Sequence, residues 1–233
     1  RTVYAVNELP GDNGPATEHG GVSAFSFDAV SGQLKLLDHV SSQGNDPCYL
    51  SLSPDGRYLL FDDHTLTQAQ DLFVLPLGKG AEHTPIPFVA TAADETFGQF
   101  SPDGRWIAYT TNESGGRREV VVQGFDPTHV PTAAVGKWII SNGGGDKPRW
   151  SANGRELYYI APDRKLMVVP VKTGATFEPG VPAPLFAMPV LIGFFPYDVA
   201  PDGRFLVSAI RDAAIAQTSP LTVVLNWQTA LKR

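Results

Sequence analysis

Short apolar segments alternate with polar turns along the whole chain, and one of these turns recurs four times in nearly the same form. The copies read Ser-Pro-Asp-Gly-Arg at 53–57 and 101–105, Ser-Ala-Asn-Gly-Arg at 151–155 and Ala-Pro-Asp-Gly-Arg at 200–204. Their glycines stand at 56, 104, 154 and 203 and are therefore 48, 50 and 49 residues apart, about the length of one four-stranded propeller blade. Proline presets φ and glycine tolerates a positive φ, so each copy predicts a tight turn between two strands.

Each repeat contains further apolar segments of strand length in matching places. Strands are predicted before the turns at 49–52, 97–100, 148–150 and 197–199, and after them at 58–61, 106–110, 157–160 and 205–210. Third strands are predicted at 71–77, 119–125, 165–171 and 221–227, and outer strands at 86–91, 137–141 and 184–188. The segments 2–8, 22–28 and 34–40 match a blade that lacks its first strand.

The repeat predicts an all-β fold: a β-propeller of about five four-stranded blades, the first and last of them incomplete. We expect a single propeller domain over residues 1–233. Its repeat units are about 1–47, 48–95, 96–146, 147–195 and 196–233. We also expect the ring to close, because an open sheet edge is an aggregation liability.

Composition narrows the classes of partner. The chain has 18 Lys and Arg against 24 Asp and Glu, a net charge of −6 and a pI of about 5.3, which argues against nucleic acid as a partner. It has no apolar run of about 18 residues, so we expect no membrane insertion, and we expect a monomer. Cys48 is the single cysteine and stands in an apolar strand pattern, which predicts a buried, inert thiol.

Two family resemblances follow from longer stretches of sequence. Tyr-Ala-Val-Asn-Glu at 4–8, Gly-Val-Ser-Ala-Phe-Ser-Phe-Asp at 21–28 and Asp-Pro-Cys-Tyr-Leu-Ser at 46–51 make residues 1 to about 60 resemble the seven-bladed lactonase family that includes 6-phosphogluconolactonase. Asp-Leu-Phe-Val-Leu-Pro-Leu at 71–77, the segment 98–114 and Ser-Pro-Leu-Thr-Val-Val-Leu-Asn-Trp at 219–227 make residues from about 71 onward resemble TolB-like propeller repeats. The TolB-like repeats are similar to those that follow bacterial serine/threonine kinase domains. A seam between 61 and 71 indicates a natural recombinant or an assembled hybrid, because blades exchange as units.

The resemblances imply different activities. Lactonase chemistry, as that resemblance implies it, uses His, Arg and Glu side chains of later blades that this chain lacks. TolB-like repeats imply binding, sensing or scaffolding, and they imply an extracytoplasmic, periplasmic location.

One polar residue per blade stands five positions before each turn glycine: Ser51, Gln99, Arg149 and Asp198. These positions belong to the strands expected to line the central channel, which predicts an axial site for a small polar ligand. The alternative is a ring of hydrogen bonds between blades, with Arg149 and Asp198 as an ion pair.

Carboxylates and amides gather at the ends of the second strands, on the rim opposite the turns. Candidate ligands there for Ca²⁺ or another hard cation are Glu8, Asp62, Asp63, Glu113, Asp163 and Asp212. The alternative is a set of solvated loop carboxylates, in which case no cofactor is expected. The turn arginines Arg57, Arg105, Arg155 and Arg204 allow an anion-binding crown, or solvated residues paired with the turn aspartates Asp55, Asp103 and Asp202.

The chain has no kinase glycine-rich loop, no P-loop lysine and no Gly-x-Ser-x-Gly elbow, and we therefore assign no catalytic residue from sequence. We expect a non-enzymatic propeller module that binds a protein, a peptide or a small polar ligand at a rim or at the axial mouth. The alternative is a lactone-hydrolysing enzyme of the propeller lactonase type. A third possibility is a hybrid without activity.

Overall fold

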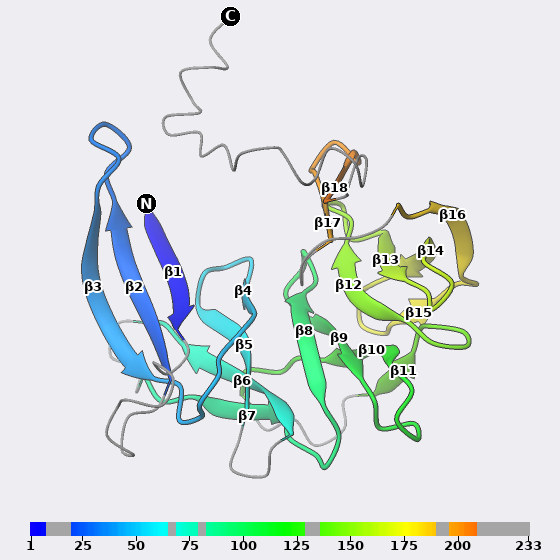
Figure 1. Ribbon diagram of the computed structural model, residues 1–233, viewed down its shortest axis with the longest axis horizontal. Helices are drawn as coiled ribbons and strands as arrows, with labels where there is room; N and C mark the ends of the chain where they lie inside the picture. The colour runs from blue at the N-terminus through cyan, green and yellow to red at the C-terminus, as the bar shows by residue number, and fades with distance from the viewer. Residues whose placement is uncertain (8–19, 65–68, 79–82, 129–135, 190–195, 209–233) are drawn as a thin grey trace, which may run out of the picture.

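The computed structural model describes residues 1–7, 20–64, 69–78, 83–128, 136–189 and 196–208, and every regular element within these ranges is a β-strand. The strands form antiparallel sheets that follow one another along the chain (Figure 1). Each sheet corresponds to one predicted repeat unit, and we call them blades 1 to 5. The predicted all-β class and the predicted order of incomplete and complete blades are confirmed.

The bounds of the strands are as follows. Blade 1 contains β1 (Thr2–Asn7), β2 (Gly21–Phe27) and β3 (Leu34–Ser41), and blade 2 contains β4 (Leu50–Leu52), β5 (Tyr58–His64), β6 (Gln70–Pro76) and β7 (Ile86–Val89). Blade 3 contains β8 (Glu95–Phe100), β9 (Trp106–Thr111), β10 (Glu119–Gly124) and β11 (Lys137–Ile139). Blade 4 contains β12 (Asp146–Trp150), β13 (Glu156–Ile160), β14 (Lys165–Lys172), β15 (Glu178–Pro179) and β16 (Ala183–Ala187), and blade 5 contains β17 (Tyr197–Val199) and β18 (Phe205–Val207).

The recurring turn forms as the sequence predicts. Gly56 has φ of +71°, a conformation that glycine adopts without a Cβ clash, and its N–H donates to the carbonyl of Ser53 at 2.9 Å. The Ser53 hydroxyl also accepts the N–H of Tyr58 at 2.9 Å, which ties the turn to the start of β5. Gly104, Gly154 and Gly203 have φ of +71°, +69° and +84° and donate to the equivalent carbonyl in their own turns.

Neighbouring blades pack face to face through apolar clusters. Leu60, Leu72 and Val74 of blade 2 meet Ile107 and Tyr109 of blade 3 in one of them. The next cluster joins blades 3 and 4 and includes the rings of Trp106, Trp150 and Phe177. Because blade 3 is covered on both faces, all residues of β9 and β10 are buried. Burial of such side chains is the main stabilising contribution, at about 1.5–3 kcal/mol for each large one.

A second kind of contact ties the inner strands together. Phe97 and Lys147 stand at the same place in β8 and β12, at bulges where each has φ of +57°. The N–H of Phe97 donates to Asp62 Oδ2 at 2.9 Å, and the N–H of Lys147 donates to Thr110 Oγ1 at 3.1 Å. Asp62 and Thr110 occupy the same repeat position, six residues after the turn glycine. We call this contact the inter-blade latch.

The latch is absent at the next interface for a reason visible in the sequence. The equivalent positions are Ile160, which has no side-chain acceptor, and Pro196, which has no N–H to donate. The donor and the acceptor are thus lost together between blades 4 and 5. Because both are lost, no N–H group and no side-chain oxygen of this latch is left without a partner.

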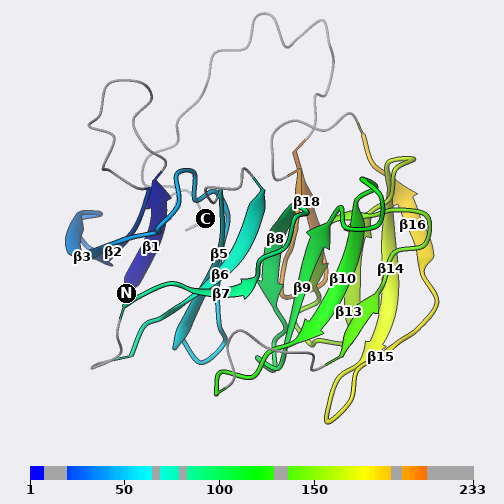
Figure 2. The same ribbon diagram turned by 90° about the horizontal axis from the view of Figure 1, so that it is seen from below.

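The sheets lie along an arc that starts at blade 1 and ends at β17 and β18 (Figures 1 and 2). The predicted closed ring is not formed by the residues that the structure describes. At the start of the arc, β3 of blade 1 leaves Leu34, Leu36 and Leu37 more than half exposed.

Two details differ from the sequence prediction, and a third prediction falls on residues that the structure does not describe. β15 was not predicted, because two residues are too short to show an apolar pattern. The predicted third strand of blade 5, at 221–227, lies outside the described residues. The prediction for Cys48 is wrong: its thiol is exposed, because β4 begins only at Leu50 and Cys48 lies in the preceding loop.

Candidate functional site

The innermost strands of blades 2 to 5 line a half-open cavity of about 420 Å³. Its lining includes all four predicted axial residues: Ser51 from β4, Gln99 from β8, Arg149 from β12 and Asp198 from β17. The blade repeat brings them together because equivalent positions of successive inner strands face the same axis. Their role in binding a ligand stays a prediction.

Arg149 is the buried charge of this cavity. Its side chain is 6% exposed, whereas that of Asp198 is 73% exposed, and 3.7 Å separate Arg149 Nε from Asp198 Oδ1. One guanidinium nitrogen donates to the carbonyl of Pro148 at 2.8 Å. The guanidinium carbon also lies 5.2 Å from the ring centre of Tyr49 and 5.9 Å from that of Tyr197, within the range of cation–π attraction.

Gln99 and Ser51 link neighbouring blades. Gln99 Oε1 accepts the N–H of Trp150 at 2.8 Å, and Ser51 Oγ accepts the N–H of Phe100 at 3.4 Å. The alternative interpretation of the axial residues was a set of hydrogen bonds between blades, with Arg149 and Asp198 as an ion pair. These contacts are present. The axial residues therefore hold the blades together and also line a cavity.

Two tyrosines of the cavity were missed from the sequence. The Tyr197 hydroxyl donates to the carbonyl of Lys147 at 2.8 Å, and burial raises the pKa of this hydroxyl well above its usual range. Burial also raises the pKa of Tyr49, although the nearby Arg149 charge opposes the shift. Both tyrosines are therefore neutral at pH 7. Their place within two residues of Ser51 and Asp198 was the signal that could have found them.

The predicted rim carboxylates that the structure describes do not meet at one point. The two oxygens of Asp62, which is 1% exposed, accept the N–H groups of Tyr49 and Phe97 at 2.8 and 2.9 Å. Asp63 Oδ1 accepts the N–H of Asp46 at 2.8 Å. Burial raises the pKa of both carboxyl groups, and for Asp62 it outweighs the two hydrogen bonds.

The other candidate cation ligands lie apart from these two. Glu113 is exposed and pairs with Lys137, and Asp163 pairs with Lys165 at 2.8 Å, which lowers the pKa of Asp163. Glu8 and Asp212 lie outside the described residues. In the part of the chain that the structure covers, no three His, Cys, Asp or Glu side chains are grouped so that they could hold a metal ion.

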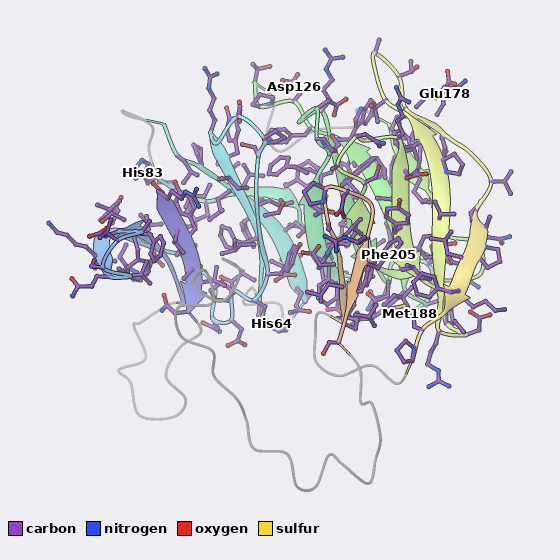
Figure 3. The ribbon with its side chains drawn as sticks, turned by 90° about the horizontal axis from the view of Figure 1, so that it is seen from above. His64, His83, Asp126, Glu178, Met188 and Phe205 are labelled. Carbon is purple, nitrogen blue, oxygen red and sulfur yellow. The ribbon has the colours of Figure 1, made fainter. Side chains whose placement is uncertain are left out.

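The turn arginines match the solvated alternative. All four are exposed, and Arg204 Nε lies 2.7 Å from Asp202 Oδ2 while Arg57 Nε lies 3.8 Å from Asp55 Oδ2. The two rims are distinct: His64, at the end of β5, lies on the face opposite Asp126 and Glu178 (Figure 3).

Comparisons with known proteins agree with this architecture. The family model described as "Lactonase, 7-bladed beta-propeller" matches residues 1–93. Among solved structures, the periplasmic gluconolactonase of Pseudomonas aeruginosa is similar at 23% identity and a TM-score of 0.62, over 88% of this chain and 60% of that protein. The fold is an incomplete β-propeller.

Other propellers are similar in the same way. A Bacteroides uniformis protein assigned as a 6-phosphogluconolactonase has 23% identity and a TM-score of 0.60, over 87% of this chain and 59% of its own. An Agrobacterium tumefaciens protein assigned as TolB has 15% identity and a TM-score of 0.53, over 73% of this chain and 57% of its own. Both predicted resemblances, to lactonases and to TolB, are confirmed, and the lactonase match reaches residue 93 rather than about 60.

The present propeller spans about three fifths of the length of these structures. No curated protein matches its sequence. The described residues include no helix long and apolar enough to cross a membrane.

Proposed function

We propose that this propeller binds a lactone in the axial cavity and hydrolyses it. The observation that carries the proposal is the buried Arg149 guanidinium next to the exposed Asp198 carboxylate, 3.7 Å apart, in the wall of a cavity of about 420 Å³. A small polyhydroxylated lactone is of suitable size for such a cavity, and polar side chains of Ser51, Gln99 and Ser208 line it. The lactonase family match and the similarity to gluconolactonases support the same reaction class.

The two charged side chains have complementary roles in this reaction. A water molecule attacks the carbonyl carbon of the lactone, and the Asp198 carboxylate takes a proton from that water. Arg149, whose own side chain is buried, stabilises the negative charge that develops on the carbonyl oxygen. The ring C–O bond then breaks, the proton passes from Asp198 to the released ring oxygen, and the product is a hydroxy acid.

The test is a pH-stat assay of acid release from glucono-1,5-lactone. We expect Asp198→Asn to lower kcat on the order of 10²-fold or more, because a general base contributes about 10²–10⁴-fold. We expect Arg149→Gln to lower kcat/KM on the order of 10²-fold.

The matched control is Asp202→Asn, which removes an exposed aspartate of the same hairpin that pairs with Arg204. It should turn over at the rate of the parent chain. Absence of acid release above the buffer blank in the parent chain would overturn the enzyme proposal.

A non-enzymatic binding module is the second candidate. It is supported by the hydrogen bonds that Gln99 and Ser51 accept from neighbouring blades, because these bonds give the two side chains a structural role rather than a catalytic one. In that case a small polar ligand binds in the cavity with measurable heat but without turnover, and Asp198→Asn changes affinity alone.

Three smaller proposals concern the cellular location of the protein, cation binding at the rim and the evolutionary origin of the chain. We propose an extracytoplasmic location, supported by the similarity to a periplasmic gluconolactonase, and fractionation of the native host would test it. The reaction proposed above uses protein groups alone. A hard cation at the rim would have to use exposed carboxylates such as Glu113 and Asp163, since both oxygens of Asp62 already accept N–H groups. A hybrid origin stays a hypothesis, to be tested by finding relatives that join the same two halves.

A further inference from the structure

The Arg149–Asp198 pair is an unequal ion pair. Arg149 is held among the blades, whereas Asp198 stands on the exposed hairpin of β17 and β18. The separation of 3.7 Å between Nε and Oδ1 is longer than a hydrogen bond, so the carboxylate neutralises the guanidinium without bonding to it directly. Asp198 Oδ1 instead accepts the N–H of Val199 at 2.9 Å.

The guanidinium is also fixed in place without Asp198. The carbonyl of Pro148 accepts one of its N–H groups, and its central carbon lies over the rings of Tyr49 and Tyr197. A guanidinium carries five N–H donors in a rigid fork that suits the two oxygens of a carboxylate. A buried cation held in this way is costly unless it is well paired, and Asp198 pairs with it only loosely.

We infer that Arg149 binds the carboxylate of a hydroxy acid, and that Asp198 competes with this ligand for the guanidinium. The inference rests on the proposed function, because hydrolysis of a lactone generates such a carboxylate in the same cavity. Two oxygens of the ligand replace the distant Asp198 oxygen at Arg149, and the exposed Asp198 side chain turns to solvent. The hydroxy-acid product is therefore an inhibitor of the reaction, and Asp198 limits this inhibition.

Removal of the Asp198 charge should then strengthen product binding. Two effects act in the same direction: a competing anion disappears from Arg149, and the ligand carboxylate no longer meets a like charge nearby. Both effects are electrostatic, so they should shrink as salt is added.

The experiment measures binding of gluconate by isothermal titration calorimetry, with gluconamide as its uncharged analogue. In Asp198→Asn we expect gluconate affinity to rise on the order of tenfold at low salt and less at high salt, with gluconamide affinity unchanged. Asp202→Asn, which removes an equal charge from the same hairpin, should bind gluconate like the parent chain.

Arg149→Gln should lose gluconate binding, and Arg149→Lys should recover only part of it, because lysine lacks the planar fork. Melting temperatures of the variants would show that they fold. Gluconate affinity in Asp198→Asn equal to or below that of the parent chain would overturn the inference, and so would the absence of gluconate binding in both.

Failure of the inference and failure of the proposed function are distinguishable. If Asp198→Asn stops turnover but leaves gluconate affinity unchanged, the hydrolytic proposal stands and the competition is wrong. If the parent chain shows no turnover but Asp198→Asn binds gluconate more tightly, the carboxylate site stands and the enzyme proposal is wrong.

Discussion

Asp62 illustrates how a candidate metal ligand becomes a structural group once it is buried between blades. Sequence places it among loop carboxylates, but its two oxygens accept the N–H of Tyr49 in its own blade and the N–H of Phe97 in the next. Loss of an acceptor at such a buried site costs about 1–3 kcal/mol for each donor left without a partner. The carboxylate therefore contributes to the inner wall of the cavity by holding two of its strands.

The pH dependence of stability should report on Asp62. Burial raises the pKa of its carboxyl group in the folded chain. Between the unfolded pKa of about 3.9 and the higher folded value, the folded chain holds a proton that the unfolded chain has lost. Stability from this group is therefore largest below the unfolded pKa and falls as the pH rises through the folded pKa.

The measurement is the free energy of unfolding in urea at several pH values, for the parent chain and for Asp62→Asn. We expect the difference between the two curves to show this fall, because the asparagine does not titrate. We also expect the variant to be less stable by about 1–3 kcal/mol above the folded pKa, since the carboxylate accepts both N–H groups there, whereas the asparagine NH₂ group faces one of the two donors. A difference that stays constant with pH would argue against the raised pKa.

The axial residues show what a sequence can reveal about a site. Ser51, Gln99, Arg149 and Asp198 were found because they share one repeat position, and a repeat places equivalent residues around one axis. The contacts that each side chain makes could not be predicted in this way. Whether a carboxylate at the end of a strand meets water, a lysine or a backbone N–H depends on the neighbouring blade, and a single sequence does not encode that distance directly.

Among the elements, the inner strands carry the geometry that matters most for the cavity. β8 and β12 are interrupted by bulges at which Phe97 and Lys147 adopt a positive φ. Residues other than glycine adopt this conformation rarely, so the sequence gives no sign of it. The latch to Asp62 or Thr110 in the preceding blade offsets the strain by satisfying the N–H of the bulged residue.

Thr110 provides a test of the latch between blades 3 and 4. Its hydroxyl accepts the N–H of Lys147 and donates to Asp146 Oδ1 at 3.2 Å. Thr110→Val keeps the shape but removes both bonds, and we expect it to lower the free energy of unfolding by about 1–3 kcal/mol. Thr110→Ser keeps the hydroxyl and should cost clearly less, so equal losses in urea denaturation would contradict the latch.

The fold of the whole molecule could largely be predicted from the sequence because one turn motif repeats. The turns at Gly56, Gly104, Gly154 and Gly203 fix where the first strand of blades 2 to 5 ends and the second begins, and the structure agrees to within a few residues. Agreement is poorest at the periphery. β15 is too short to leave a pattern, and Cys48 lies in a loop whose direction is set by hydrogen bonds to blade 2 rather than by its own apolar neighbours.

The free energy of local opening should differ between the central and the end blades of the arc. The cavity lies between the more stable and the less stable strands. The central strands β9 and β10 are wholly buried, whereas β3 and the hairpin of β17 and β18 are largely exposed or half-buried. That hairpin is held to blade 4 by contacts such as Phe205 on the ring of Tyr158, 5.0 Å between centres, near Met188 (Figure 3). It carries Asp198 and Tyr197, so we expect this wall of the cavity to open more readily than the others.

Hydrogen exchange tests this gradient and its link to function. We expect the slowest amide exchange in β9 and β10, and exchange faster by several orders of magnitude in β17 and β18, which can open without disturbing the central blades. A ligand bound between Arg149 and the hairpin stabilises the closed form, so saturating gluconate should slow exchange in β17 and β18 in proportion to its concentration over its dissociation constant. Protection that spreads equally over β3, which does not line the cavity, would place the ligand elsewhere.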